Sequence, residues 1–165
     1  MSDLNLNGKR IIVTGASGGL GRAFCESLAA AGASVIAADI DEAGASQTAK
    51  DISAEGGTCI SGAVDVANAG SCTALVARAI DALGGLDVLV NNAALYGTLK
   101  RAPFEKLEED EWDRVLSVNV KGVWQMTRAA SDALKASGSG SVINIASATV
   151  FSGSPEWMHY VASKG

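Results

Sequence analysis

A run of glycines near the start of the chain could bring the backbone close to a phosphate group. The pattern is Gly-x-x-x-Gly-x-Gly from Gly15 to Gly21, directly after an apolar run at residues 10–14. Glycine accepts positive φ angles and has no Cβ to hold a ligand away from the backbone. A helix that begins here would direct free N–H groups and its positive dipole end at a pyrophosphate. The alternative is a plain tight turn. The residues of this predicted dinucleotide site are Gly15, Ser17, Gly18, Gly19, Leu20 and Gly21.

Acidic residues follow the next two predicted strands. Asp39 could accept hydrogen bonds from the ribose hydroxyls of an adenosine, and its charge would repel a 2′-phosphate. Because its neighbours Gly18 and Ile40 are not basic, the sequence predicts NAD rather than NADP. Asp65 is placed to reach the adenine amino group, and Val66 to pack on the ring. Two alternatives remain: Asp39 only begins a loop, and Asp65 is the N-cap of a helix.

Small and polar residues follow the fourth and fifth predicted strands. Asn92, Ala93 and Ala94 come after the fourth strand. Small side chains there would let a cofactor ribose pass close to the backbone, and an asparagine could tie adjacent strands together. Ser147 comes after the fifth strand, where it could face the same cleft or only cap the strand end.

A tyrosine and a lysine stand four residues apart near residue 165. Tyr160 and Lys164 fall on a last predicted helix, which Pro155 opens. Residues i and i+4 share a helix face, so the hydroxyl and the ammonium group can point into one cleft. The alternative is an ordinary surface pair. His159 would point elsewhere on such a helix, and we expect no catalytic role for it.

Strand and helix patterns alternate along the whole chain. Short continuous apolar runs predict strands that are buried on both faces, and amphipathic stretches closed by glycines predict helices. This alternation predicts a single α/β domain over residues 1–165, with a doubly wound parallel sheet of the Rossmann type and strand order 3-2-1-4-5. Ligands then bind beyond the carboxyl ends of strands 1 and 4. The predicted strands are 10–14, 33–38, 58–63, 86–91 and 141–146, and the longer predicted helices are 19–31, 42–54, 69–83 and 108–136.

Composition excludes several classes of function. The formal net charge of −5 argues against binding to nucleic acid, which requires clustered basic residues. No apolar stretch is long enough to span a membrane, and residues 1–5 lack the features of a signal peptide. Three cysteines without a CxxC pattern suit reduced thiols in a cytoplasmic protein. The single histidine rules out a multi-histidine metal site, so we expect no metal.

Together these motifs resemble the short-chain dehydrogenase/reductase family in its common single-domain form. The matching segments lie in family order and at family spacing over essentially the whole chain. Ala94 is a small departure, because the family usually has glycine there. Family members also continue well beyond the Tyr-x-x-x-Lys motif, so we expect this domain to be incomplete at its C-terminus. The matching segments are residues 14–21, Asp65-Val66, residues 91–94, residues 117–120, Ser147 and Tyr160 with Lys164.

The resemblance implies an oxidoreductase that moves a hydride between a nicotinamide cofactor and an alcohol or carbonyl substrate. It implies that Tyr160 is the general acid/base and that Lys164 assists it and binds the nicotinamide ribose. Ser147 would hold and polarise the substrate oxygen, and Asn119 would position a water that links Lys164 to solvent. It also implies a homodimer or homotetramer for the complete protein.

Other interpretations remain open. The chain could be a non-catalytic dinucleotide-binding module, or an inactive fragment whose fifth strand forms an exposed apolar edge. Asn119 could be a buried residue at a helix bend. Phe151, Trp157 and Met158 could form an apolar substrate wall or simply pack their loop.

Overall fold

Five parallel strands form one sheet in the computed structural model, which describes residues 5–165. The order is β3-β2-β1-β4-β5, as the sequence predicts. Residues 1–4 of the predicted domain lie outside the described part. Neighbouring strands pair in parallel throughout, for example Ile12 with Ile36 and with Leu89. The strands are β1 Arg10–Thr14, β2 Ser34–Asp39, β3 Thr58–Ala63, β4 Val88–Asn91 and β5 Ser141–Asn144.

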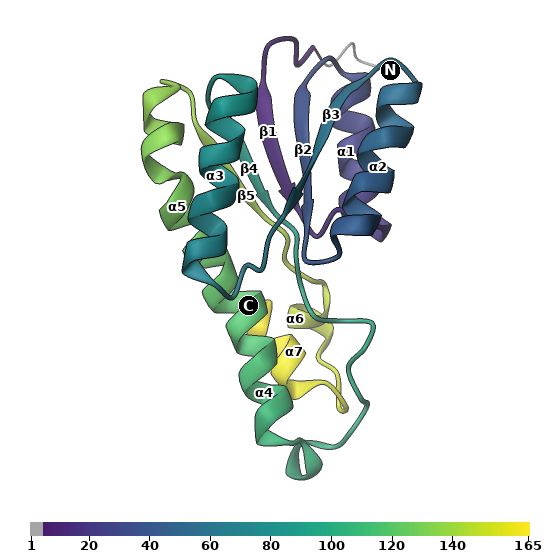
Figure 1. Ribbon diagram of the computed structural model, residues 1–165. Coiled ribbons are helices and arrows are strands. Elements are labelled where there is room, and N and C mark those ends of the chain that lie inside the picture. Colours follow the sequence, from purple (N-terminus) through teal and green to yellow (C-terminus); the bar gives the residue numbers. More distant parts are fainter. Residues whose placement is uncertain (1–4) are drawn as a thin grey trace.

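Helices cover both faces of the sheet (Figure 1). α1 and α2 pack on one face, and α3 and α5 on the other. Beyond the carboxyl ends of the strands, α4, α6 and α7 form a second, lower part in Figure 1. The helices are α1 Gly19–Ala30, α2 Glu42–Ala54, α3 Ala69–Leu83, α4 Glu109–Leu116, α5 Gly122–Ala136, α6 Thr149–Ser152 and α7 Met158–Ser163.

Alternating side chains of the central strands form two separate apolar cores. Ile11 and Val13 of β1 pack with Cys25 of α1, whereas Ile12 between them packs with Met126 of α5. Each of these residues is at most 1% exposed. A strand buried on both faces must be apolar at every position, which is the pattern that predicted these strands.

β5 differs from the central strands because its side chains are exposed. Val142 is 39% exposed and Ile143 is 47% exposed. The described structure therefore has the exposed apolar strand that the fragment interpretation expected.

The structure departs from the predicted elements in the second half of the chain. The predicted helix over 108–136 is interrupted by a π-helical turn at Ser117–Lys121, which separates α4 from α5. α6 and a 3-10 turn at Phe104–Lys106 were not predicted. α7 begins at Met158 rather than at Pro155. The carbonyl of Glu156 instead accepts a hydrogen bond from the distant Ala102 N–H, at 3.1 Å.

Within residues 5–165, none of the helices is long and apolar enough to cross a membrane. The same residues contain no cluster of three or more His, Cys, Asp or Glu side chains that could hold a metal ion.

An ion pair fastens the start of β1 to the residue that precedes β4. The Asp87 carboxylate accepts hydrogen bonds from the backbone N–H of Arg10 at 2.9 Å, from its Nε at 2.7 Å and from its Nη2 at 3.1 Å. These bonds to the Arg10 side chain hold the pKa of Asp87 below its usual value of 3.8.

We predict that Asp87→Asn lowers the free energy of unfolding by about 1.5–3 kcal/mol near neutral pH, because it removes charge-assisted hydrogen bonds at a nearly buried site. The folded-state pKa is depressed, so this contribution is present above the unfolded pKa and is lost as the pH falls through the folded value. Urea unfolding of both proteins at about pH 7 and about pH 2 measures it. A difference that stays the same at both pH values would contradict the ion-pair explanation.

Candidate functional site

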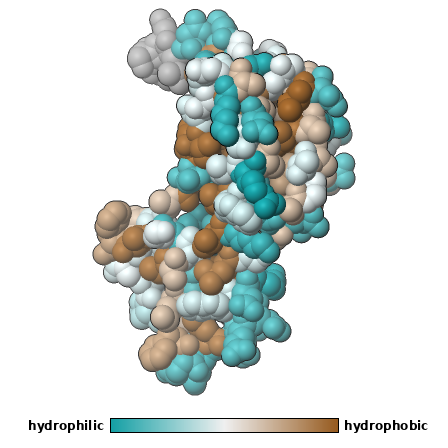
Figure 2. All heavy atoms as spheres, turned by 90° about the vertical axis from the view of Figure 1, so that its left-hand side faces the viewer, coloured by the Kyte–Doolittle hydropathy of each residue, from teal (hydrophilic) through white to brown (hydrophobic). Residues whose placement is uncertain are grey.

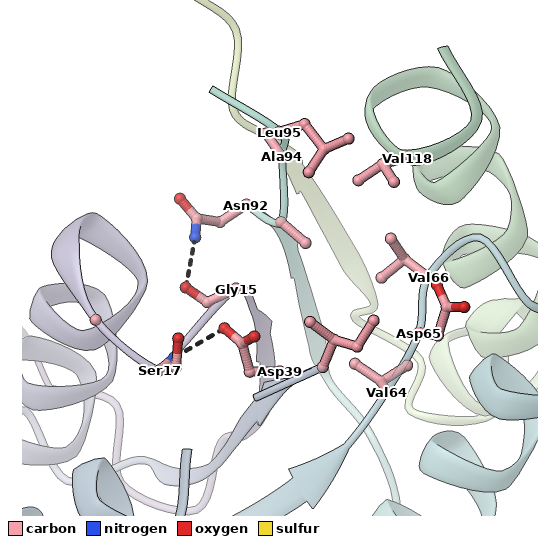
Figure 3. A pocket seen from close by; sticks show the side chains of 13 residues that line it. Gly15, Ser17, Asp39, Val64, Asp65, Val66, Asn92, Ala94, Leu95 and Val118 are labelled. Atoms are coloured by element: carbon pink, nitrogen blue, oxygen red, sulfur yellow. Dashed lines mark hydrogen bonds between the residues drawn. The ribbon is translucent and has the colours of Figure 1, made fainter. Parts of the chain in front are cut away.

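A cleft of about 370 Å³ opens at the carboxyl ends of β1, β2 and β4 (Figure 3). The structure brings ten of the predicted residues to its walls, from four separate segments of the chain. Three further residues line the walls: Val64 and Leu95, which carried no sequence signal beyond being apolar, and Val118, which belongs to the matching segment 117–120 but was given no role. The predicted residues in the walls are Gly15, Ser17, Gly18, Asp39, Ile40, Asp65, Val66, Asn92, Ala93 and Ala94.

Two glycines let the first turn pack directly against the end of β4. A Cβ on Gly15 would lie 2.8 Å from the Cα of Ala93, and Gly15 has φ +70°. A Cβ on Gly21 would overlap the carbonyl oxygen of Gly15. Asn92 fills the remaining space, and its Nδ2 donates to the carbonyls of Thr14 at 2.9 Å and of Gly15 at 3.1 Å. Asn92 thus ties β4 to β1, as the sequence suggested.

The N-terminus of α1 borders the cleft through its N-cap Gly18, whereas the predicted residues Gly19, Leu20 and Gly21 are not among the wall residues. The first hydrogen bond of this helix runs from Arg22 N–H to Gly18 O at 3.2 Å, so the N–H groups of residues 19–21 have no acceptor in the described structure. Gly18 supplies no side-chain cap, and a Cβ on Gly18 or on Gly19 would meet no atom within 4 Å. Free donors beside open space are the arrangement that binds a pyrophosphate. The residues present therefore fit a dinucleotide.

Asp39 borders the same turn. Its carboxylate accepts hydrogen bonds from Ser17 N–H at 2.9 Å and from Asp41 N–H at 3.0 Å, and the residue is 9% exposed (Figure 3). A carboxylate has about four acceptor positions, so capacity remains for hydroxyl groups of a ligand. Asp39 is the last residue of β2 and lines the cleft, so it does more than begin a loop.

Asp65 and Val66 form the opposite wall. Asp65 is not the N-cap of α3, because Asn68 occupies that position and accepts from Ser71 N–H at 3.0 Å. The Asp65 carboxylate instead accepts from Ala67 N–H at 2.9 Å. The carbonyl of Val66 accepts from Gln125 Nε2 at 3.1 Å, which holds this wall against α5.

Asn119 lies at the bend between α4 and α5. Its Oδ1 accepts from Leu95 N–H at 2.8 Å, and its Nδ2 donates to Leu95 O at 3.2 Å and to Ser163 Oγ at 2.9 Å. The side chain therefore joins the loop after β4 to α7. Both amide hydrogens have partners in these bonds, and Asn119 is buried at a helix bend, as the alternative interpretation had it.

Lys164 lies one residue beyond α7, because that helix ends at Ser163. Its Nζ donates to the carbonyl of Ile145 at 2.7 Å, in a second cavity of about 320 Å³ that Asn119 also lines. Burial lowers the pKa of Lys164. Tyr160 and Lys164 are four residues apart in the sequence, as the prediction requires. Lys164 is the C-cap of α7, however, so the helix that carries Tyr160 does not continue through it.

Tyr160 is packed among aromatic rings and is 7% exposed. Its ring centroid lies 5.0 Å from that of Tyr96 and 6.3 Å from that of Trp157. Ser147 Oγ accepts from the N–H of Thr149 at 3.3 Å and from its Oγ1 at 2.9 Å. Within residues 5–165, no hydrogen bond links Tyr160 to Ser147 or to Lys164.

Four residues close to Tyr160 in the sequence were also considered above: His159, for which no catalytic role was expected, and the three suggested as a substrate wall. His159 is fully buried, stacks on Trp112 at 6.5 Å, and has its Nε2 3.5 Å from Glu111 Oε2. Of the three residues suggested as a substrate wall, Trp157 packs on Tyr160. Phe151 and Met158 are 94% and 50% exposed.

Comparison with known proteins identifies the family. The model of the short chain dehydrogenase family matches residues 9–165. The chain belongs to the short-chain dehydrogenase family. This confirms the resemblance that the sequence motifs indicated.

Three relatives illustrate the similarity. A short chain dehydrogenase/reductase of Aspergillus oryzae is 37% identical over 97% of this chain, and D-threitol dehydrogenase of Mycolicibacterium smegmatis is 33% identical over 98%. A crystal structure of a gluconate 5-dehydrogenase from Burkholderia cenocepacia, in complex with NADP and tartrate, superimposes with a TM-score of 0.90 at 32% identity over 99% of this chain. The chain spans 61% of the first two relatives and 63% of the third.

We predict that Gly21→Ala destabilises this short-chain dehydrogenase domain by about 1–3 kcal/mol, because the added methyl overlaps the Gly15 carbonyl. Gly18→Ala is the matched control, since its φ of −174° is extended and its Cβ would enter open space. It should change stability by less than about 0.5 kcal/mol but weaken dinucleotide binding, because Gly18 lines the cleft. Urea unfolding and the fluorescence of bound NADH measure the two effects. Equal destabilisation by both variants would contradict the packing argument.

Proposed function

We propose that the protein containing this chain is an NAD-dependent oxidoreductase that interconverts an alcohol and a carbonyl compound. The observation that carries the proposal is the open N-terminus of α1, which faces a cleft bordered by Asp39 and by the end of β4. Membership of the short-chain dehydrogenase family supports the same activity. The bound nicotinamide cofactor would supply or accept the hydride.

The cofactor half of the site is assigned to the cleft. The N–H groups at residues 19–21 would bind the pyrophosphate, and Asp39 would accept from the adenosine ribose. Asp65 and Val66 would border the adenine, while Ala93 and Ala94 would leave room for the second ribose. The residues given this role are Gly15, Ser17, Gly18, Gly19, Leu20, Gly21, Asp39, Ile40, Asp65, Val66, Asn92, Ala93 and Ala94, together with Tyr160 and Lys164 at the nicotinamide end.

Preference for NAD over NADP rests on Asp39. A 2′-phosphate beside this carboxylate would bring two negative groups together in a cleft whose described walls contain no lysine or arginine. The Burkholderia gluconate 5-dehydrogenase has NADP bound, so the family fold by itself does not decide between the two cofactors.

Tyr160 is proposed to exchange a proton with the substrate oxygen, which Ser147 would hold by a hydrogen bond. Lys164 would assist this proton transfer and bind the nicotinamide ribose from its place in the cavity that Asn119 also lines. Asn119 would position the water that connects Lys164 with solvent. Because Ser147 is bonded to Thr149 and Lys164 to Ile145 in this structure, both side chains must exchange partners to act together.

The substrate is proposed to be a small polyhydroxylated alcohol or sugar acid. Relatives named D-threitol dehydrogenase and gluconate 5-dehydrogenase support this class.

We also propose that the complete protein is a cytoplasmic homodimer or homotetramer. Apolar side chains gather near the middle of the face that carries α5 (Figure 2), and Trp124 on that helix is 54% exposed. The three cysteines are buried free thiols, which suits a reducing compartment.

A non-catalytic dinucleotide-binding module is the competing proposal. The observation that favours it is the burial of Tyr160 without a hydrogen bond to Ser147 or to Lys164. Turnover by the full-length protein separates the two proposals.

We predict that Tyr160→Phe lowers kcat of the full-length protein by about 10²–10⁴-fold, because it removes the group that transfers the proton. NADH affinity should change much less than kcat, because the pyrophosphate would still bind in the cleft around the glycine turn, which Tyr160 does not line. Tyr96→Phe, at the other tyrosine of the chain, is the control and should retain turnover. Absorbance of reduced nicotinamide measures the rates. Unchanged turnover in Tyr160→Phe would refute its role, and no turnover by wild type on any alcohol would favour the binding module.

We predict that Asp39→Asn reduces the ratio of kcat/KM for NAD to kcat/KM for NADP by about tenfold or more, because the repulsion of the 2′-phosphate disappears. Asp41→Asn removes the same charge two residues away, where the carboxylate caps α2, and should leave the ratio unchanged. A wild-type preference for NADP would overturn the role of Asp39.

A further inference from the structure

Arg101 is held against the aromatic cluster that surrounds Tyr160. Its guanidinium lies 4.7 Å from the centre of the Trp157 ring, within the range of a cation–π contact. Trp157 meets Tyr160 edge-on at 6.3 Å and Tyr96 at 5.3 Å. The positive charge of Arg101 therefore lies against the Trp157 ring, which packs directly on Tyr160, the proposed acid/base. The loop after β4 contributes Arg101 and Tyr96, and the segment before α7 contributes Trp157.

We propose that Arg101 is a specificity-determining residue that binds the carboxylate of a hydroxy-acid substrate whose hydroxyl reacts at Tyr160. The inference deepens the proposed function and rests on it, because it assumes that the substrate oxygen is held at Tyr160. Arginine presents planar N–H donors that match a carboxylate in a bidentate way. A neutral polyol offers no such partner, so Arg101 would favour acids over polyols of the same length.

A hydrogen bond at the next residue holds the backbone beside Arg101, while the N–H donors of its guanidinium remain accessible to a ligand. Ala102 N–H donates to Glu156 O at 3.1 Å, which joins the loop after β4 to the residue before Trp157. The side chain of Arg101 is 69% exposed, and its Nη1 lies 3.9 Å from Glu156 Oε2. An exposed ion pair at this separation contributes little, so a carboxylate ligand can replace Glu156.

Lys100 provides an internal control for simple charge attraction. It is exposed and adjacent to Arg101, and its backbone N–H donates to Glu111 Oε1 at 3.3 Å. The described structure records no contact between its side chain and the aromatic rings. Lys100→Gln and Arg101→Gln therefore remove the same charge one residue apart, but only the second removes the guanidinium from Trp157.

The test compares D-gluconate with D-sorbitol, which share a six-carbon chain and differ at C1, where gluconate carries the carboxylate. Binding of each to the full-length protein with cofactor is measured by calorimetry, and kcat/KM by absorbance of reduced nicotinamide. We expect Arg101→Gln to reduce the preference for gluconate over sorbitol by about 10- to 100-fold, the value of charge-assisted hydrogen bonds. Lys100→Gln should keep the preference, and Arg101→Lys should restore only part of it.

The outcomes separate this inference from the proposed function. If Arg101→Gln weakens both ligands equally, or if Lys100→Gln has the same effect, Arg101 is not a carboxylate site and the inference is overturned. If wild type oxidises alcohols but binds gluconate no better than sorbitol, the inference fails while the proposed function stands. If gluconate binds in a manner that depends on Arg101 but no alcohol is oxidised, the carboxylate site stands and the proposed function fails.

Discussion

The contact between the ends of β1 and β4 is the constraint on which the site depends. Thr14 Oγ1 donates to Val90 O at 3.3 Å and accepts from the N–H groups of Asn92 and Ala93, each at 3.1 Å. With the two bonds from Asn92 Nδ2, these contacts draw the first turn so close to β4 that no side chain fits at Gly15. The polar groups at this junction satisfy one another, and the unsatisfied N–H groups are left at the start of α1, facing the cleft.

The sheet and this junction could be predicted from the sequence because the signals are local. Strands buried on both faces must be apolar at every position, and the glycines are needed wherever two segments touch. The position of Asp39 was also predictable, since it ends β2 in a fold where strand ends meet at one edge. Val64 and Leu95 line the same cleft but could not be singled out, because an apolar residue in a wall has the same sequence signature as one in the core.

The lower part of the molecule could not be predicted in the same way, because long-range contacts determine it. Residues 117–121 were predicted as part of one continuous helix, yet they form a π-helical turn in which Asn119 bonds to Leu95 and Ser163. Spacing placed Tyr160 and Lys164 on one helix face, but α7 ends at Ser163 and Lys164 bonds to Ile145. Neither feature has a local sequence pattern. The family resemblance suggested the residues of the proposed catalytic group, but the sequence did not predict how they are arranged.

Leu95 connects the two parts of the site. It lines the dinucleotide cleft, while its backbone N–H and carbonyl hold both ends of the Asn119 amide. Asn119 in turn bonds to Ser163 at the end of α7, the helix that carries Tyr160. Because the sheet is buried on two faces whereas α7 is held by a few such bonds and by aromatic contacts, the cofactor side has the stiffer support. The loop that contains Leu95 also reaches α7 through the contact between the Tyr96 and Tyr160 rings at 5.0 Å, so one loop borders the cleft and contacts the helix that carries Tyr160.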